Sequence, residues 1–174
     1  KRQMFNRKKY EQDAVNLYRS TNTAILSTMS KKYEGYPFGS FITYATDKSR
    51  TLFMYTSDIA QHTKNLKNDS KACVTLFKLD TEYDKQNSSR LTLMGDLKKV
   101  PKDELEGCQE RFVKFLPESK KYSSMHDFKF YKLEISRVRW IGGFGDIAWI
   151  NPKNWKDDSP KWSKNEKMMI DHMN

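Results

Sequence analysis

The sequence predicts a mainly β (α+β) protein with flanking helices, arranged as a small antiparallel barrel. Apolar and polar residues alternate in several short segments, as they do in strands that have one buried and one exposed face. Most of these segments are joined by links of hairpin length, and only one or two connections are long enough for a helical crossover. The chain of 174 residues is 37% hydrophobic, which is enough for a substantial core in one domain. These observations favour a barrel over a doubly wound parallel sheet.

A helix and three strands are expected in the first part of the chain. Tyr10, Ala14 and Leu17 are spaced like residues on one face of a helix, which predicts a helix over residues 8–19. β-Branched and aromatic residues then predict strands, and clusters of glycine, proline and polar residues predict turns. The strands are expected at residues 23–29, 38–46 and 51–55, with turns at 31–36 and 47–50.

Further strands and two more helices follow. A helix over about residues 58–67 precedes strands at 72–79, 90–98, 128–140 and 146–150, with a polar loop at 80–88. Gly95 predicts a bulge, and a shift in alternation near Ser136 and Arg137 predicts another. Pro101 and Pro117 bound the third helix. Its apolar stripe is typical of core packing and consists of Leu105, Cys108, Phe112 and Phe115.

The last part of the chain differs in composition from the barrel segments. Residues 151–162 contain two prolines and many charges, which is typical of a linker. Ser163 and Glu166 form a capping box, which predicts that a helix begins there. We therefore expect a barrel domain over residues 1–150, a linker over 151–162 and the start of a truncated helical module over 163–174.

The composition restricts the class of partner. A net charge of +10 makes the surface attractive to anions, but no nucleic-acid-binding motif is present, so we expect a solvated basic surface rather than a nucleic-acid site. No apolar run reaches the roughly 20 residues of a membrane span. Cys73 and Cys108 form no CxxC pair, which argues against a structural zinc site and suits a reducing compartment. We expect a cytoplasmic protein.

The segment from Thr51 to Leu66 combines a strand with the start of a helix, and two interpretations of it are open. Thr56, Ser57 and Asp58 can cap the helix. Unpaired N–H groups at a helix start can also hold a phosphate, with help from Gln61, His62 and Lys64. Local spacing alone favours an ordinary capped helix, because the negative charge of Asp58 would lie near a bound phosphate.

The order and spacing of several segments resemble a known family. The segments are YPFGSFITYAT, TSDIAQHTKNL, RLTLMGDLKKV, HDFKFYKLEISRVRWIGGFG and MMIDHMN. They resemble the FMN-binding split-barrel proteins related to pyridoxamine 5′-phosphate oxidase, and more narrowly the haem-utilisation branch. The resemblance implies a six-stranded Greek-key split barrel that forms a homodimer, with a flavin in each of two interface clefts.

The resemblance also implies which residues contact FMN. The strand of small residues that would lie along the isoalloxazine ring is Gly39, Ser40 and Phe41. The residues implied at the ribityl-phosphate end are Thr56, Ser57, Gln61, His62 and Lys64. Arg90 would contact the flavin, and Trp140 would approach it from the partner subunit. Gln61 and His62 stand where the oxidase has Arg and Lys.

Three functions follow as expectations. The first is a flavin-dependent oxidoreductase acting on a small-molecule substrate, in which FMN carries the hydride chemistry. The alternative is a haem-binding or haem-degrading protein, for which His126 and His172 are the candidate iron ligands. The third is a module that binds a flavin or tetrapyrrole without turnover.

Overall fold

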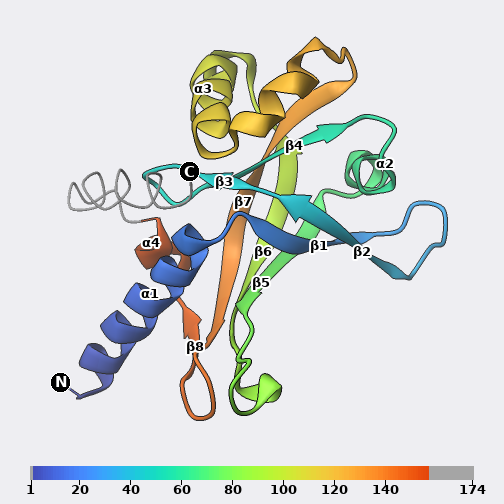
Figure 1. The fold of residues 1–174 in the computed structure, drawn as a ribbon. Helices are drawn as coiled ribbons and strands as arrows, with labels where there is room; N and C mark the ends of the chain where they lie inside the picture. Colours follow the sequence, from blue (N-terminus) through green and yellow to red (C-terminus); the bar gives the residue numbers. More distant parts are fainter. Residues whose placement is uncertain (1, 157–174) are drawn as a thin grey trace.

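The computed structural model describes residues 2–156, with side chains from residue 6 onward, and it contains one antiparallel sheet of eight strands that curls into a half-barrel (Figure 1). The strands are β1 (Thr23–Met29), β2 (Pro37–Thr43), β3 (Ala45–Thr46), β4 (Leu52–Ser57), β5 (Lys71–Lys78), β6 (Ser89–Lys99), β7 (Phe128–Ile141) and β8 (Ile147–Ile150). The helices are α1 (Arg2–Ser20), α2 (Gln61–Asn68), α3 (Leu105–Phe115) and α4 (Pro152–Trp155). Short 3₁₀ segments lie at Lys85–Asn87, Lys102–Glu104 and Pro117–Ser124.

The sheet curls because consecutive strands lie at its two ends. The strand order is β2-β1-β5-β6-β7-β4-β3, and β8 pairs with β7 beyond the end of β4. β2 and β3 are separated only by Tyr44, whose N–H donates to the carbonyl of Asn22 at 2.9 Å instead of joining a strand ladder. The predicted strand over 38–46 is therefore two strands, and the predicted count of six strands is wrong for this sheet.

The two predicted bulges are one irregularity between β6 and β7. Met94 pairs with Arg137 and Gly95 pairs with Ile135, so Ser136 is the extra residue on β7. A Cβ atom on Gly95 would lie 2.0 Å from the carbonyl oxygen of Glu134, which only glycine avoids. The bulge directs the side chains of Ser136 and Arg137 both to the outside of the barrel.

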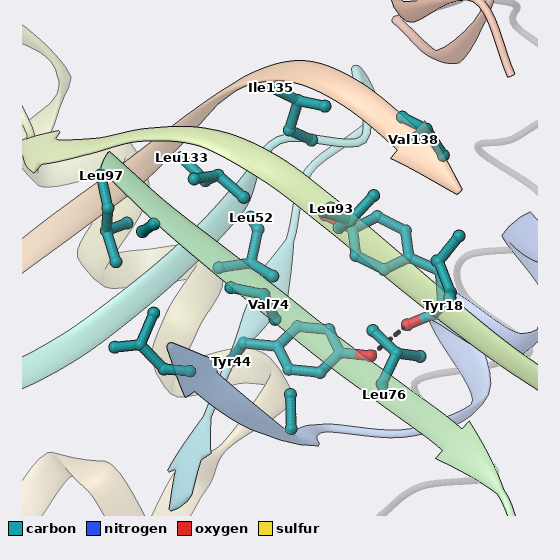
Figure 2. Packing of buried hydrophobic residues seen from close by; sticks show 14 of the residues in the cluster. Tyr18, Tyr44, Leu52, Val74, Leu76, Leu93, Leu97, Leu133, Ile135 and Val138 are labelled. Carbon is teal, nitrogen blue, oxygen red and sulfur yellow. Dashed lines mark hydrogen bonds between the residues drawn. The ribbon is translucent and has the colours of Figure 1, made fainter. Parts of the chain in front are cut away.

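The main core fills the concave side of the sheet and is closed by α1 (Figure 1). Tyr18 from α1 is stacked on Tyr44 with ring centroids 5.7 Å apart, and the Tyr44 hydroxyl donates to the Tyr18 carbonyl at 2.7 Å. Figure 2 shows these two rings among the apolar side chains of β4, β5, β6 and β7. A second cluster joins α3 to the sheet through Phe112, Phe115 and Phe130.

The packing of the barrel extends past the strand β8. Residues 152–155, predicted as the start of a linker, form the short helix α4, and Trp155 is fully buried against α1. The predicted helical module over 163–174 lies outside the described residues. Within residues 2–156, no helix is both long enough and apolar enough to cross a bilayer.

Candidate functional site

The first candidate site lies where β4 leads into α2, and the helix begins later than predicted. Thr56 and Ser57 pair with Lys129 and Phe128 of β7, so they belong to β4 and not to a helix cap. The N-cap of α2 is Ala60, which supplies no side-chain hydrogen bond. The predicted capping role of Thr56, Ser57 and Asp58 is therefore wrong, because strand pairing holds the backbone extended up to Ser57.

Thr56 and His62 form a partly buried hydrogen-bonded pair in this site. The Thr56 hydroxyl lies 2.7 Å from Nε2 of His62 and 3.2 Å from the hydroxyl of Thr63. Burial lowers the pKa of His62, which favours the neutral imidazole. A neutral imidazole that already shares a hydrogen bond with Thr56 is a weak ligand for a phosphate dianion.

The other predicted phosphate ligands are also engaged within the chain. The Ser57 hydroxyl donates to a carboxylate oxygen of Asp127, and Gln61 donates to the side-chain oxygen of Asn65 at 3.1 Å. Asp58 accepts from Lys67 at 3.2 Å and forms a second salt bridge with Lys129 at 3.7 Å. Of the residues predicted to hold a phosphate, only the exposed Lys64 carries a positive charge, while two carboxylates lie beside Ser57.

We expect the protein to lose less stability in acid when His62 is replaced by glutamine. An unfolded histidine titrates near pH 6.5, and the lowered pKa in the fold means that the unfolded chain takes up the proton first. His62 therefore contributes no pH dependence well above about pH 6.5, and it costs stability as the pH falls below that value. Glutamine keeps a polar partner for Thr56 without titrating.

Urea unfolding at about pH 8 and about pH 5 measures this effect, since the two conditions lie on either side of the ordinary histidine pKa. The wild type should lose more free energy of unfolding between these conditions than His62→Gln. His126→Gln, which removes an exposed imidazole at another position, is the matched control. An equal loss in the wild type and in His62→Gln would contradict the role given to burial.

The second candidate site is the convex face of β2, β1, β5 and β6, which we call the outer face. One row of cross-strand pairs runs over this face, from Phe41 on β2 through Ile25 on β1 and Thr75 on β5 to Thr92 on β6. Phe77 on β5 and Arg90 on β6 form the next pair on the same face. Phe41, Phe77 and Ile25 are 69%, 55% and 40% exposed. The threonines between them are short and bond to each other at 3.3 Å. The outer face thus combines exposed apolar side chains, short threonines between them and a guanidinium at one corner.

The structure divides the residues predicted to contact a flavin among three places. Gly39 and Phe41 lie on the convex side of β2, but Ser40 points to the concave side with its hydroxyl buried. Arg90 is on the outer face three strands from Phe41 and donates to the carbonyls of Gln86 and Ser88. Trp140 lies in the core and is 3% exposed.

The residues at α2 are far from Arg90 within one chain. Ser57 pairs with the first residue of β7, whereas Arg90 pairs with its last residue, Ile141. One chain therefore brings Thr56, Ser57, Gln61 and His62 together but leaves Arg90 and Trp140 apart from them. Whether these residues contact a cofactor stays a prediction.

The predicted iron ligands are placed only in part. His126 is exposed in the turn before β7. It lies near Ser57, because the next residue, Asp127, is hydrogen-bonded to Ser57. The Asp127 carboxylate beside it accepts a hydrogen bond from Ser57. His172 lies outside the described residues. Within residues 2–156 no group of three or more His, Cys, Asp or Glu side chains could hold a metal ion.

A third site, which we did not predict from the sequence, is a cleft bounded by α1, β8 and α4. Its volume is about 650 Å³, and its walls include Arg7, Arg137, Met94 and Trp149. These residues are far apart in the sequence, so no local spacing could have predicted their proximity. The shift in alternation at Ser136 and Arg137 was the only available signal, because the bulge turns Arg137 outward.

Comparisons with known proteins place these sites in a family context. The chain is 33% identical over 119 residues to the non-canonical heme oxygenase HOZ of Arabidopsis thaliana chloroplasts, covering 68% of this chain and 36% of that protein. It is 27% identical over 144 residues to the mouse (Mus musculus) protein CREG1, covering 76% of this chain and 65% of that protein. The chain thus spans less than two thirds of the length of either relative.

A solved structure with a similar fold is a heme binding protein from Mycobacterium smegmatis. The TM-score is 0.77 and the sequence identity is 28%, over 84% of this chain and 60% of that chain. The model of the CREG β-barrel family matches residues 6–157, which include the whole described sheet. The resemblance to pyridoxamine 5′-phosphate oxidase itself stays a prediction. The chain belongs to the CREG β-barrel family.

Proposed function

We propose that this chain binds haem on its outer face, in a homodimer whose second copy covers the bound macrocycle. The observation that carries the proposal is the chemistry of that face. A haem is a flat apolar ring with two carboxylates on one edge, and the outer face offers Phe41, Ile25 and Phe77 beside the guanidinium of Arg90. Relatives whose names refer to haem support the same ligand.

The need for a second copy follows from exposure. Large apolar side chains rarely stand together on a free surface, and Phe41 and Phe77 are more than half exposed. A second copy packed on this face would remove them from water. We retain His126 and His172 as candidates for the iron ligand.

The FMN-dependent oxidoreductase is the weaker candidate, for a reason found in the α2 site. FMN carries a phosphate dianion. The Ser57 hydroxyl already donates to Asp127, and the Thr56 hydroxyl already shares a hydrogen bond with His62. Asp58 and Asp127 add negative charge where the phosphate would bind, although Asp58 is offset by Lys67 and Lys129. Desolvating a dianion costs free energy, and because Lys67 and Lys129 are already paired with Asp58, Lys64 is the predicted phosphate ligand left to offset that cost.

Haemin titration of the purified chain tests the proposal. We expect a saturable Soret band with haemin and no change of flavin absorbance or fluorescence with FMN. Arg90→Gln should weaken haemin binding about tenfold, because a charge-assisted hydrogen bond contributes roughly 1.5–3 kcal/mol. Lys98→Gln, at the other end of β6 and exposed, is the matched control and should bind haemin like the wild type.

The results separate the candidates. A flavin spectrum on addition of FMN, with no Soret band on addition of haemin, would replace haem binding with the FMN function. Equal haemin affinity in Arg90→Gln and Lys98→Gln would move the haem away from the Arg90 corner. Loss of the Soret band under air with ascorbate as electron donor would extend the proposal from haem binding to ring opening.

A further inference from the structure

The cleft between α1, β8 and α4 has a different composition from the two sites above. It adjoins the outer face: Arg139 pairs with Thr92 on β6 and with Trp149 on β8, and Met94 lies two residues after Thr92 on β6. Its volume of about 650 Å³ is in the usual range of small-molecule sites, roughly 300–1,000 Å³. Neither the α2 residues nor Arg90 contribute to its walls.

One wall of the cleft is apolar and contains an exposed indole. Trp149 is 60% exposed although it is among the largest apolar side chains, and Met94 is 41% exposed beside it. The guanidinium of Arg139 lies 4.9 Å from the centre of the Trp149 ring and holds it in place. Ile150 and Pro152 complete the wall. An indole fixed at the surface of a cleft offers a flat face on which a ring can stack.

The charged residues of the cleft leave it positive. Arg7 and Arg137 contribute guanidinium groups to its walls, and Glu11 is the acidic residue among them. Glu11 accepts from the guanidinium of Arg50 at 2.9 Å, so its charge is already balanced by a residue that is 1% exposed. An anion in the cleft would therefore meet two guanidinium groups and no uncompensated carboxylate from the residues that line it.

The cleft is formed by elements that are held in place. The Asn151 side chain accepts from the N–H of Lys153 at 2.9 Å and starts α4, whose Trp155 is fully buried. The hydroxyl of Tyr10 on α1 donates to Asp146 beside β8 at 3.3 Å. A cleft whose walls are fixed in this way loses little conformational entropy when a ligand binds.

We propose that this cleft binds a compact aromatic or alicyclic anion, at a site separate from the haem site. The ring of the ligand stacks on Trp149 and contacts Met94, and its carboxylate or sulfonate pairs with Arg137 and Arg7. The proposal does not depend on haem binding, because it uses none of the residues that carry the proposed function.

A pair of fluorescent probes tests the site in the full chain. The anionic probe is 8-anilinonaphthalene-1-sulfonate, and N-phenyl-1-naphthylamine has similar rings without the charge. We expect the anionic probe to bind more tightly than the neutral one in the wild type. Arg137→Gln should weaken the anionic probe about five- to tenfold and leave the neutral probe nearly unchanged, as expected for one charge-assisted contact.

Trp149→Ala should weaken both probes, because it removes the stacking surface. Tyr83→Ala is the matched control, since Tyr83 is 90% exposed in the loop before β6 and distant in sequence from the cleft residues. Both substituted side chains are exposed, so thermal unfolding should show that the variants fold normally. Equal probe binding by Trp149→Ala and the wild type would overturn the proposal.

Competition with haemin tests whether the two sites are separate. The anionic probe should remain bound when the chain is saturated with haemin. Stoichiometric displacement of the probe would overturn the claim of a separate site. Absence of a Soret band would instead contradict the proposed haem function, and it would leave the probe result in Arg137→Gln as an independent test.

Discussion

Replacing Trp155 with alanine is expected to lower the free energy of unfolding by about 3–5 kcal/mol, the range for large-to-small changes at a buried aromatic residue. Trp155 is fully buried, its ring lies 5.2 Å from that of Tyr18, and the Arg50 guanidinium is 5.5 Å from it. Alanine would leave a cavity between α1 and the end of the barrel. Denaturant unfolding measures the loss directly.

Trp155→Phe is the control that separates volume from polarity. The indole Nε1 of Trp155 is buried and has no hydrogen-bond partner among the described residues. Phenylalanine therefore removes no hydrogen bond to those residues, and we expect it to cost much less than alanine. A small loss in Trp155→Ala would mean that α4 is not anchored to α1 by this side chain. Because α4 also lines the cleft, the same variant should weaken binding of the anionic probe.

The strands could be predicted because their patterns are local. In β5, Val74 and Leu76 face the core while Cys73 and Thr75 face outward, so alternation alone identifies the strand. The bulge was predicted for a similar reason, since Ser136 interrupts the alternation and Gly95 removes the Cβ that would clash. Each of these features depends on a few consecutive residues.

The errors arose where a distant partner decides the local conformation. Thr56 and Ser57 have the side chains of a helix cap, but pairing with β7, more than 70 residues later in the chain, keeps them in a strand. Tyr44 continues the apolar pattern of a strand, yet its N–H bonds to Asn22 and the ladder breaks. Propensity could not predict either outcome.

The candidate sites were predictable to different degrees. The residues at α2 are close in sequence, so their clustering followed from one strand and one helix. Their hydrogen bonds did not, because Asp127 comes from the turn before β7, far along the chain. The cleft joins Arg7 to Trp149 across most of the chain, and no motif links them. Sequence reasoning therefore predicted the clustering of residues at α2 and missed the cleft.

Replacing Arg50 with methionine is expected to cost about 3–5 kcal/mol of unfolding free energy, the range for breaking a buried ion pair. Arg50 is 1% exposed, donates to Glu11 on α1 at 2.9 Å and reaches the carbonyl of Asn154 on α4 at 3.4 Å. Methionine matches the apolar stem of arginine but leaves Glu11, which is 23% exposed, without its counter-charge.

A double-mutant cycle distinguishes the ion pair from the loss of packing. Glu11→Gln removes the carboxylate that Arg50 contacts at 2.9 Å, and the double variant Arg50→Met/Glu11→Gln removes both charges. We expect the double variant to be more stable than the sum of the single losses predicts, by roughly 0.5–3 kcal/mol. Arg50→Lys should recover only part of the loss, because an ammonium cannot reach Glu11 and lie flat on Trp155 at once. Additive single losses would show that α1 and α4 are joined through Arg50 by packing, and not by its charge.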